Sequence, residues 1–236
     1  MPVPRRFVAF DLETTSPDPE QARVVTAFIG LFDVVADDFV EKHHWLLDPG
    51  VAIPEEAAAI HGYTTEDVQL AGMDPRIGVF AITQRLDIYQ RENLAITAYN
   101  GRYDFTVLDR ELRRHYPGIT PFAPKALLDP YLLDKMVDPY RKGSRKLTAV
   151  AEHYRVPVEE NAHDAEADSL MTARVAVRVL QHPALRQLTP MQVHARCVPE
   201  AVKQARSFAA YLTKQGRHSE ARLVRAEWPI PPLPVA

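Results

Sequence analysis

The sequence predicts an α/β fold in which a mixed five-stranded sheet carries helices on both faces. Two observations lead to this prediction. An apolar stretch at 7–13 is followed by two further β-rich stretches, and from residue 75 onward helical and strand patterns alternate. Three successive β segments favour an antiparallel meander, whereas alternating helices and strands favour αβα units beside it. At 236 residues, the chain can bury one sizeable core and retain some length for an appendage.

The meander is predicted from apolar runs and turn signals. Its strands are expected at 7–13, 23–34 and 39–47, with Asp37-Asp38 as a hairpin turn. Three helical segments follow: a short helix at 54–60, a capped turn at 64–68 and an amphipathic helix at 75–92. Thr64 and Asp67 have the spacing of a capping box, with Asp in place of the usual Glu.

Beyond residue 92, short strands and helices alternate. The strands are predicted at 94–99 and 125–128, and the helices at 103–115, 131–136, 145–154 and 164–180. After residue 180 the pattern changes, because Pro183, Pro190 and Pro199 are expected to separate short helical pieces. A further helix is expected at 200–215, and 228–234 favours an extended polyproline-like conformation. The sequence therefore predicts a domain at 1–182 and a helical, Pro-rich extension at 183–236.

The composition is typical of a soluble globular protein. The chain has 28 basic and 31 acidic residues, so nucleic acid could be held only by local positive charge. No apolar run is long enough to cross a bilayer, and the N-terminus lacks the apolar core of a signal peptide. Cys197 is the only cysteine, which excludes an intrachain disulfide and a thiolate zinc cluster. We therefore expect a cytoplasmic protein without a membrane segment.

The opening strand ends in two carboxylates. Asp11 and Glu13 are two residues apart, so both side chains point to one side of the strand while Leu12 points into the core. Like charges this close repel unless a cation lies between them, and carboxylate oxygens suit Mg²⁺ or Mn²⁺. The alternative is a solvated strand end with two unrelated acids. The tripeptide alone favours that alternative.

Asn100 and Asp104 form a second pattern, at the junction of a strand and a helix. The carboxyl ends of parallel strands gather at one edge of a sheet, where ligands usually bind. Asn100 lies at such an end, and Asp104 lies in the first turn of the next helix. The alternative is that Asn100 caps the helix and Asp104 favours its dipole.

Two more patterns contain histidine. In His163-x-Ala165-x-x-Asp168, a loop enters a long helix, and a His near carboxylates suits proton transfer near neutral pH. The alternative is an acidic helix N-terminus, since Asp164 and Glu166 are adjacent. Ile60-His61-Gly62 ends the short helix, and an ordinary helix end with glycine explains it equally well.

The joint order of these motifs resembles the DEDDh class of 3′–5′ exonucleases. The closest likeness is to the proofreading epsilon subunit of bacterial DNA polymerase III, and it covers about residues 7–180. The resemblance implies a ribonuclease H-like fold and two Mg²⁺ or Mn²⁺ ions held by Asp11, Glu13, Asp104 and Asp168, with His163 as general base. It also implies release of nucleoside 5′-monophosphates from the 3′ ends of DNA. The family's contacts to the terminal nucleotide match Thr14, Glu56, Ile60, His61, Asn100 and Tyr103.

Further partners are expected from two other segments. The basic loop contributes possible phosphate contacts at Arg141, Lys142, Arg145 and Lys146, or it is simply a solvated loop. The extension could dock on a DNA polymerase through Trp228 and its prolines, or it could fold back along its own domain. Two other functions stay open: an exoribonuclease, and a non-catalytic module that binds nucleic acid or a polymerase. The second would predict loss of the acidic set, which is complete here.

Overall fold

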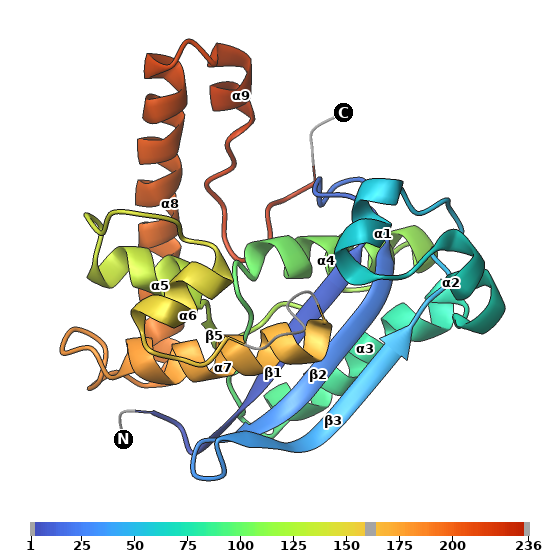
Figure 1. The fold of residues 1–236 in the computed structure, drawn as a ribbon, viewed down its shortest axis with the longest axis horizontal. Helices are drawn as coiled ribbons and strands as arrows, with labels where there is room; N and C mark the ends of the chain where they lie inside the picture. Colours follow the sequence, from blue (N-terminus) through green and yellow to red (C-terminus); the bar gives the residue numbers. More distant parts are fainter. Residues whose placement is uncertain (1–2, 159–163, 234–236) are drawn as a thin grey trace.

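The computed structural model describes residues 3–158 and 164–233, which form a five-stranded mixed sheet in the order β3-β2-β1-β4-β5 (Figure 1). Its strands are β1 (Arg6–Thr14), β2 (Val24–Asp33), β3 (Asp38–Leu46), β4 (Ile96–Thr97) and β5 (Leu127–Leu128). The first three strands pair antiparallel, whereas β4 runs parallel to β1 and to β5. The predicted mixed sheet, with its meander followed by αβα units, is confirmed.

Helices cover both faces of this sheet. They are α1 (Glu55–His61), α2 (Thr65–Ala71), α3 (Pro75–Arg91), α4 (Arg102–His115), α5 (Pro130–Val137), α6 (Leu147–His153), α7 (Ala165–Leu180), α8 (Pro190–Lys214) and α9 (His218–Leu223). Helix α7 packs across β1 and β2 on the face nearer the viewer, and α3 packs on the opposite face (Figure 1). Among the described residues, no helix combines the length and apolar character needed to cross a membrane.

Strand β1 is the centre of the core because it has strands on both sides and helices on both faces. Its residues Phe7–Phe10 are all 0–1% exposed, which explains why four apolar residues follow one another without polar alternation.

A local sequence signal sets the start of α2. The Asp67 N–H donates to Thr64 Oγ1 (3.2 Å) and the Thr64 N–H to Asp67 Oδ2 (2.8 Å), so the predicted capping box starts α2.

One prediction about the extension is wrong. Helix α8 continues through Pro199, which was expected to separate two helical pieces. A proline removes its own N–H donor and strains one turn, but α8 is held by packing on both sides of that turn. Cys197 is fully buried before it, and the Gln204 side chain donates to the Leu132 carbonyl (3.1 Å) after it. Helix α9, also unexpected from the sequence, lies beside the far end of α8 (Figure 1).

The segment after α9 lies against the domain, which is the second of the two arrangements expected for it. Trp228 is 8% exposed, its ring packs 4.9 Å from the His194 ring, and its Nε1–H donates to Asp129 Oδ2 (3.4 Å). The Arg110 guanidinium donates to the carbonyls of Pro231 (3.0 Å) and Pro232 (3.2 Å). The division of the chain at 182/183 stays a prediction.

Replacing Pro199 by alanine should stabilise the protein. Residue 199 lies in the helix interior, where proline is about 3 kcal/mol less favourable than alanine, and the new N–H can donate to the preceding turn. We expect the free energy of unfolding to rise by about 1–3 kcal/mol in urea denaturation. The control is Pro190→Ala, because proline is well accommodated in a first turn. Equal effects of the two substitutions would contradict this explanation.

Candidate active site

The predicted pair of acids lies at the carboxyl end of β1, in the middle of the sheet. Leu12 is buried, with 5% of its surface exposed, whereas Asp11 and Glu13 on either side are half-buried, as strand alternation requires. The pairing register with β2 shifts between Glu13 and Thr14. Such an irregularity ends the regular ladder and changes the direction of the chain, so the acids stand where the strand opens into a loop.

Two helices bring further carboxylates to the same place. Asp104 lies in the first turn of α4 and is 3% exposed, and its carboxylate accepts hydrogen bonds from its own N–H and from the N–H of Leu12. Asp168 lies in the first turn of α7, and its charge acts on both Asp11 and Glu13. The structure therefore brings together the four acids that the motifs single out, from three separate elements.

Burial and mutual repulsion change the ionisation of this cluster. Burial raises the pKa of Asp11 well above its usual value, and the charges of Asp104, Glu13 and Asp168 raise it further. The pKa of Glu13 is raised to about 7 by burial and by the charge of Asp168. Burial is also the main reason why the pKa of Asp104 is raised to about 8. Carboxylates in this environment favour the protonated form unless positive charge is supplied.

The donor chemistry fits a hard divalent cation. The four groups offer only carboxylate oxygens, and a cation would offset the burial and repulsion that raise the pKa values of Asp11, Glu13 and Asp104. Within residues 3–158 and 164–233, no three acidic, histidine or cysteine side chains are already arranged as a metal site. The acids therefore interact through their charges, and their side chains would have to move to surround an ion.

A cavity of about 640 Å³ opens beside Glu13. Most of the predicted contacts to a terminal nucleotide line it, namely Thr14, Glu56, Ile60, His61 and Tyr103. Ile60 is 54% exposed, so its side chain presents an apolar surface at the edge of this cavity. We call this space the nucleoside cavity.

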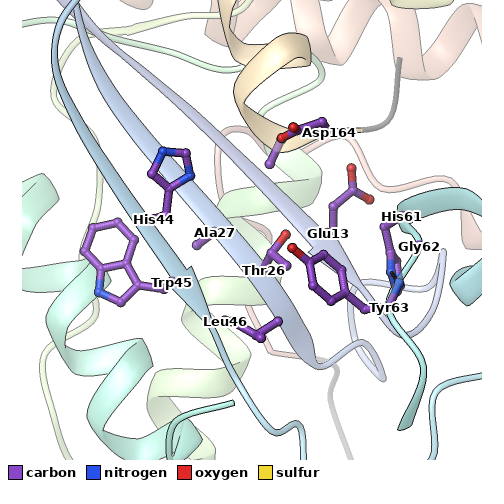
Figure 2. A pocket seen from close by; sticks show the side chains of 11 residues that line it. Glu13, Thr26, Ala27, His44, Trp45, Leu46, His61, Gly62, Tyr63 and Asp164 are labelled. Carbon is purple, nitrogen blue, oxygen red and sulfur yellow. Dashed lines mark hydrogen bonds between the residues drawn. The ribbon is translucent and has the colours of Figure 1, made fainter. Parts of the chain in front are cut away.

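His61 joins the nucleoside cavity to a second cavity of about 560 Å³, because His61 and Glu13 line both. Figure 2 shows the second cavity, with Asp164 at the start of α7 facing Glu13. His61 Nδ1 accepts the Tyr63 N–H (3.2 Å), which places the ring proton on Nε2. Burial lowers the pKa of His61, and its Nε2 has no hydrogen-bond partner among the described residues. A buried, unpaired N–H beside two cavities is suited to donate to a ligand.

Tyr103 fixes the wall of the nucleoside cavity. Its hydroxyl hydrogen-bonds with Thr14 Oγ1 and with the Ser16 carbonyl. Burial raises the pKa of Tyr103 to about 12, so the hydroxyl stays protonated. These bonds tie the first turn of α4, which carries Asp104, to the loop that follows β1. The position of the cavity wall and that of the carboxylate are therefore set together.

Asn100 and His163 differ from the other predicted residues. Asn100 adopts a positive φ of 57° and donates its N–H to Asp129 Oδ1 (3.0 Å), and it lines cavities on the other side of the α4 start. His163 lies in 159–163, outside the described residues. Its predicted role therefore stays a prediction, although α7 begins two residues later.

The basic loop divides into two kinds of residue. Arg141 and Arg145 both pair with the fully buried carboxylate of Asp134, which also accepts the Tyr154 hydroxyl (3.0 Å). Their guanidinium groups hold the loop to α5. Lys142 and Lys146 are exposed and remain the candidates for phosphate contacts.

The sequence did not single out Asp129, which is the hydrogen-bond centre of this region. Its carboxylate accepts the N–H groups of Asn100 (3.0 Å) and Tyr131 (3.1 Å) in addition to the Trp228 indole. Burial raises its pKa to about 6, although these donors favour the charged form. The signal available was an acid at a strand end directly before Pro130, which predicts a helix cap and nothing more.

The family follows from a comparison with protein-family models. The model described as Exonuclease matches residues 8–176, so the chain belongs to the exonuclease family. This range contains all four acids of the cluster. The resemblance to DEDDh exonucleases is confirmed at the level of the family, whereas the closer likeness to the epsilon subunit stays a prediction. Members of this family typically use divalent metal ions. Among curated protein sequences, none matches the chain significantly.

Solved structures agree with this fold. Escherichia coli exonuclease I in complex with a dT13 oligonucleotide superposes with a TM-score of 0.60 at 21% identity, covering 78% of this chain and 42% of that one. The nuclease domain of 3′hExo, a DEDDh family member bound to rAMP, has a TM-score of 0.61 at 17% identity, with 78% and 95% covered. The chain thus spans less than half of exonuclease I and nearly the whole of the 3′hExo domain.

The metal-free protein should lose stability as the pH rises. The folded pKa values of about 7 for Glu13 and about 8 for Asp104 lie above the unfolded values of about 4. Between pH 4 and 8 the folded state therefore binds more protons than the unfolded state, so the free energy of unfolding falls through this window. In EDTA we expect Tm to be lower at pH 8 than at pH 5, and added Mg²⁺ to raise it most at pH 8.

Asp104→Asn tests the cause of this effect, because the amide keeps the shape and removes the charge. In EDTA at pH 8 its Tm should exceed that of the wild type, and its Tm should change less with pH. Asp87→Asn on the exposed face of α3 is the control. Parallel pH profiles for Asp104→Asn and the wild type would refute the assignment.

Proposed function

We propose that this chain is a metal-dependent 3′–5′ exonuclease that releases nucleoside 5′-monophosphates from single-stranded or frayed DNA ends. The observation that carries this proposal is the position of the acidic cluster, which lies directly beside the nucleoside cavity and shares Glu13 with it. A cavity for one nucleoside next to a site for phosphate chemistry suits an enzyme that acts at an end of a strand.

The residues of the nucleoside cavity have separate tasks in this proposal. Ile60 and the Tyr103 ring pack against the base and sugar of the terminal nucleoside. Glu56 accepts a hydrogen bond from the terminal 3′-OH, and Thr14 offers its backbone N–H and hydroxyl. The Nε2–H of His61 donates to the bound nucleotide, because it has no partner among the described residues and its side chain lines both cavities.

The acids and His163 have the chemical tasks. Asp11, Glu13, Asp104 and Asp168 would hold two ions, Mg²⁺ or Mn²⁺, which supply positive charge to the scissile phosphate and lower the pKa of water. His163 takes a proton from the attacking water as general base. Its place just before α7 supports this role, because α7 delivers Asp168 to the same cluster.

Substituting His163 or Asp168 by alanine should abolish most of the activity. Loss of a general base typically lowers kcat about 10²–10⁴-fold. The measurement is release of mononucleotides from a 3′-labelled single strand with Mg²⁺, and His218→Ala on α9 is the matched control. Wild-type rates for both variants would show that the assignment is wrong.

The choice between DNA and RNA rests on the 2′-hydroxyl. Exonuclease I structures hold dT13 or dA16 oligonucleotides, whereas 3′hExo holds rAMP. An exoribonuclease of the same family is therefore the second candidate. We favour DNA because the motif order most resembles a DNA proofreading subunit.

Digestion of matched DNA and RNA strands of one sequence decides between the two candidates. We expect kcat/KM to be higher for DNA, with nucleoside 5′-monophosphates as the only early product. A higher value for RNA would establish the exoribonuclease. Absence of cleavage of either strand with Mg²⁺ or Mn²⁺ would favour a non-catalytic binding module.

A polymerase is the partner proposed for the extension. Trp228 is buried against the domain, so the docking surface of this form of the protein would have to be α8 and α9 and not the Trp228 segment. Both helices carry exposed apolar side chains, among them Tyr211 and Leu223.

A further inference from the structure

A groove separates the nuclease domain from the extension. One cavity of about 290 Å³ lies between α5, α8 and the segment after α9, and an adjoining cavity of about 470 Å³ lies beside residues 144–146. Asn100 and Tyr131 line both cavities, so the two adjoin. We call the pair the extension groove, and the residues used below are Asn100, Arg102, Tyr131, Lys135, Lys146, Phe208 and Arg225.

The extension groove begins where the nucleoside cavity ends. Asn100 and Arg102 line the groove, and Tyr103 lines the nucleoside cavity. Arg102 and Tyr103 are consecutive residues in the first turn of α4, so the groove and the nucleoside cavity meet at this turn. A strand whose terminal nucleoside occupies the cavity could then extend its preceding nucleotides into the groove.

The walls of the groove offer aromatic faces and amines. Phe208 on α8 is 53% exposed and borders the groove with its ring. The Lys135 ammonium lies 3.9 Å from the centre of the Tyr131 ring and donates to its hydroxyl (2.5 Å). Lys146 is exposed at the other end. Aromatic rings on which bases stack, together with lysines that meet phosphates, are the features that bind single strands.

Charge is distributed unequally between the two walls. Residues 183–236 contain eight basic and three acidic residues, whereas residues 1–182 contain 20 basic and 28 acidic residues. The net charge of residues 1–182 therefore disfavours a polyanion at long range, whereas the net charge of residues 183–236 gives the extension a positive field that favours one. The acids at the groove do not cancel this field: Asp129 is buried under four donors, and Glu227 pairs with Arg225 (3.2 Å).

We propose that the extension groove binds the nucleotides that precede the 3′ end of a single-stranded nucleic acid. This inference rests on the proposed exonuclease function and assigns the extension a part in substrate binding. A single strand is required because only unpaired bases can stack on the exposed ring of Phe208. The groove would hold the strand between successive cleavages, and the substrate would be drawn toward it by the positive extension.

The test compares two substrates. A 12-nucleotide DNA strand reaches the groove, whereas the 4-nitrophenyl ester of thymidine 5′-monophosphate occupies the terminal site alone. For Phe208→Ala and for Lys135→Ala we expect the ratio of kcat/KM for the strand to kcat/KM for the ester to fall about 10-fold. The first variant loses a stacking contact and the second loses a phosphate contact. Met191→Ala, at the other end of α8, and Lys203→Ala are matched controls, since both residues are exposed and lie outside the groove.

Binding measured without turnover separates this inference from the proposed function. In EDTA, fluorescence anisotropy of the labelled 12-mer should give a Kd about 10-fold higher for Phe208→Ala than for Met191→Ala. For Lys135→Ala, the slope of log Kd against log salt should also decrease by about 0.7. If strand binding weakens as expected but neither substrate is cleaved, the groove binds single strands and the proposed exonuclease function is wrong. If both substrates are cleaved and the variants match their controls, the groove is not a nucleic-acid site.

Discussion

Repulsion among buried carboxylates is the constraint on which the rest of this structure depends. Burial and neighbouring charges raise the pKa values of Asp11, Glu13 and Asp104 together, so holding these groups at one point opposes folding near neutral pH. Interactions elsewhere compensate for this. The fully buried run Phe7–Phe10 anchors β1, and the Leu12 N–H holds the Asp104 carboxylate against the strand. The packing of the surrounding core holds these carboxylates in place despite the unfavourable free energy of bringing them together.

The start of α4 connects the acidic cluster to the nucleoside cavity on one side and to the extension groove on the other. On one side, Tyr103 is fastened to the loop after β1, which forms the nucleoside cavity. On the other side, the Asn100 N–H is fixed by Asp129, which also caps α5 and accepts the Trp228 indole. Asp104 follows these two fastened residues along the chain. The extension is therefore connected through Asp129 to the residues just before the turn that carries Asp104.

The distribution of charge fits the proposed chemistry. In the proposed function, an acidic site would have to bind a polyanion although residues 1–182 carry an excess of acids. Bound cations would neutralise the site locally, and the basic extension would act on the strand at longer range. The overall charge of −3 is the sum of an acidic segment and a basic one.

The sequence by itself determined the features that depend on near neighbours and on motif order. These are the strand that ends in Asp11 and Glu13, the capping box of α2, the mixed sheet and the exonuclease family. Tertiary structure alone decided which side chains meet between separate elements. It pairs Arg141 and Arg145 with the buried Asp134, joins Asp129 to Trp228 across 99 positions, and carries α8 through Pro199. Propensity and periodicity describe only a few turns of chain, whereas these contacts arise from packing that no local pattern encodes.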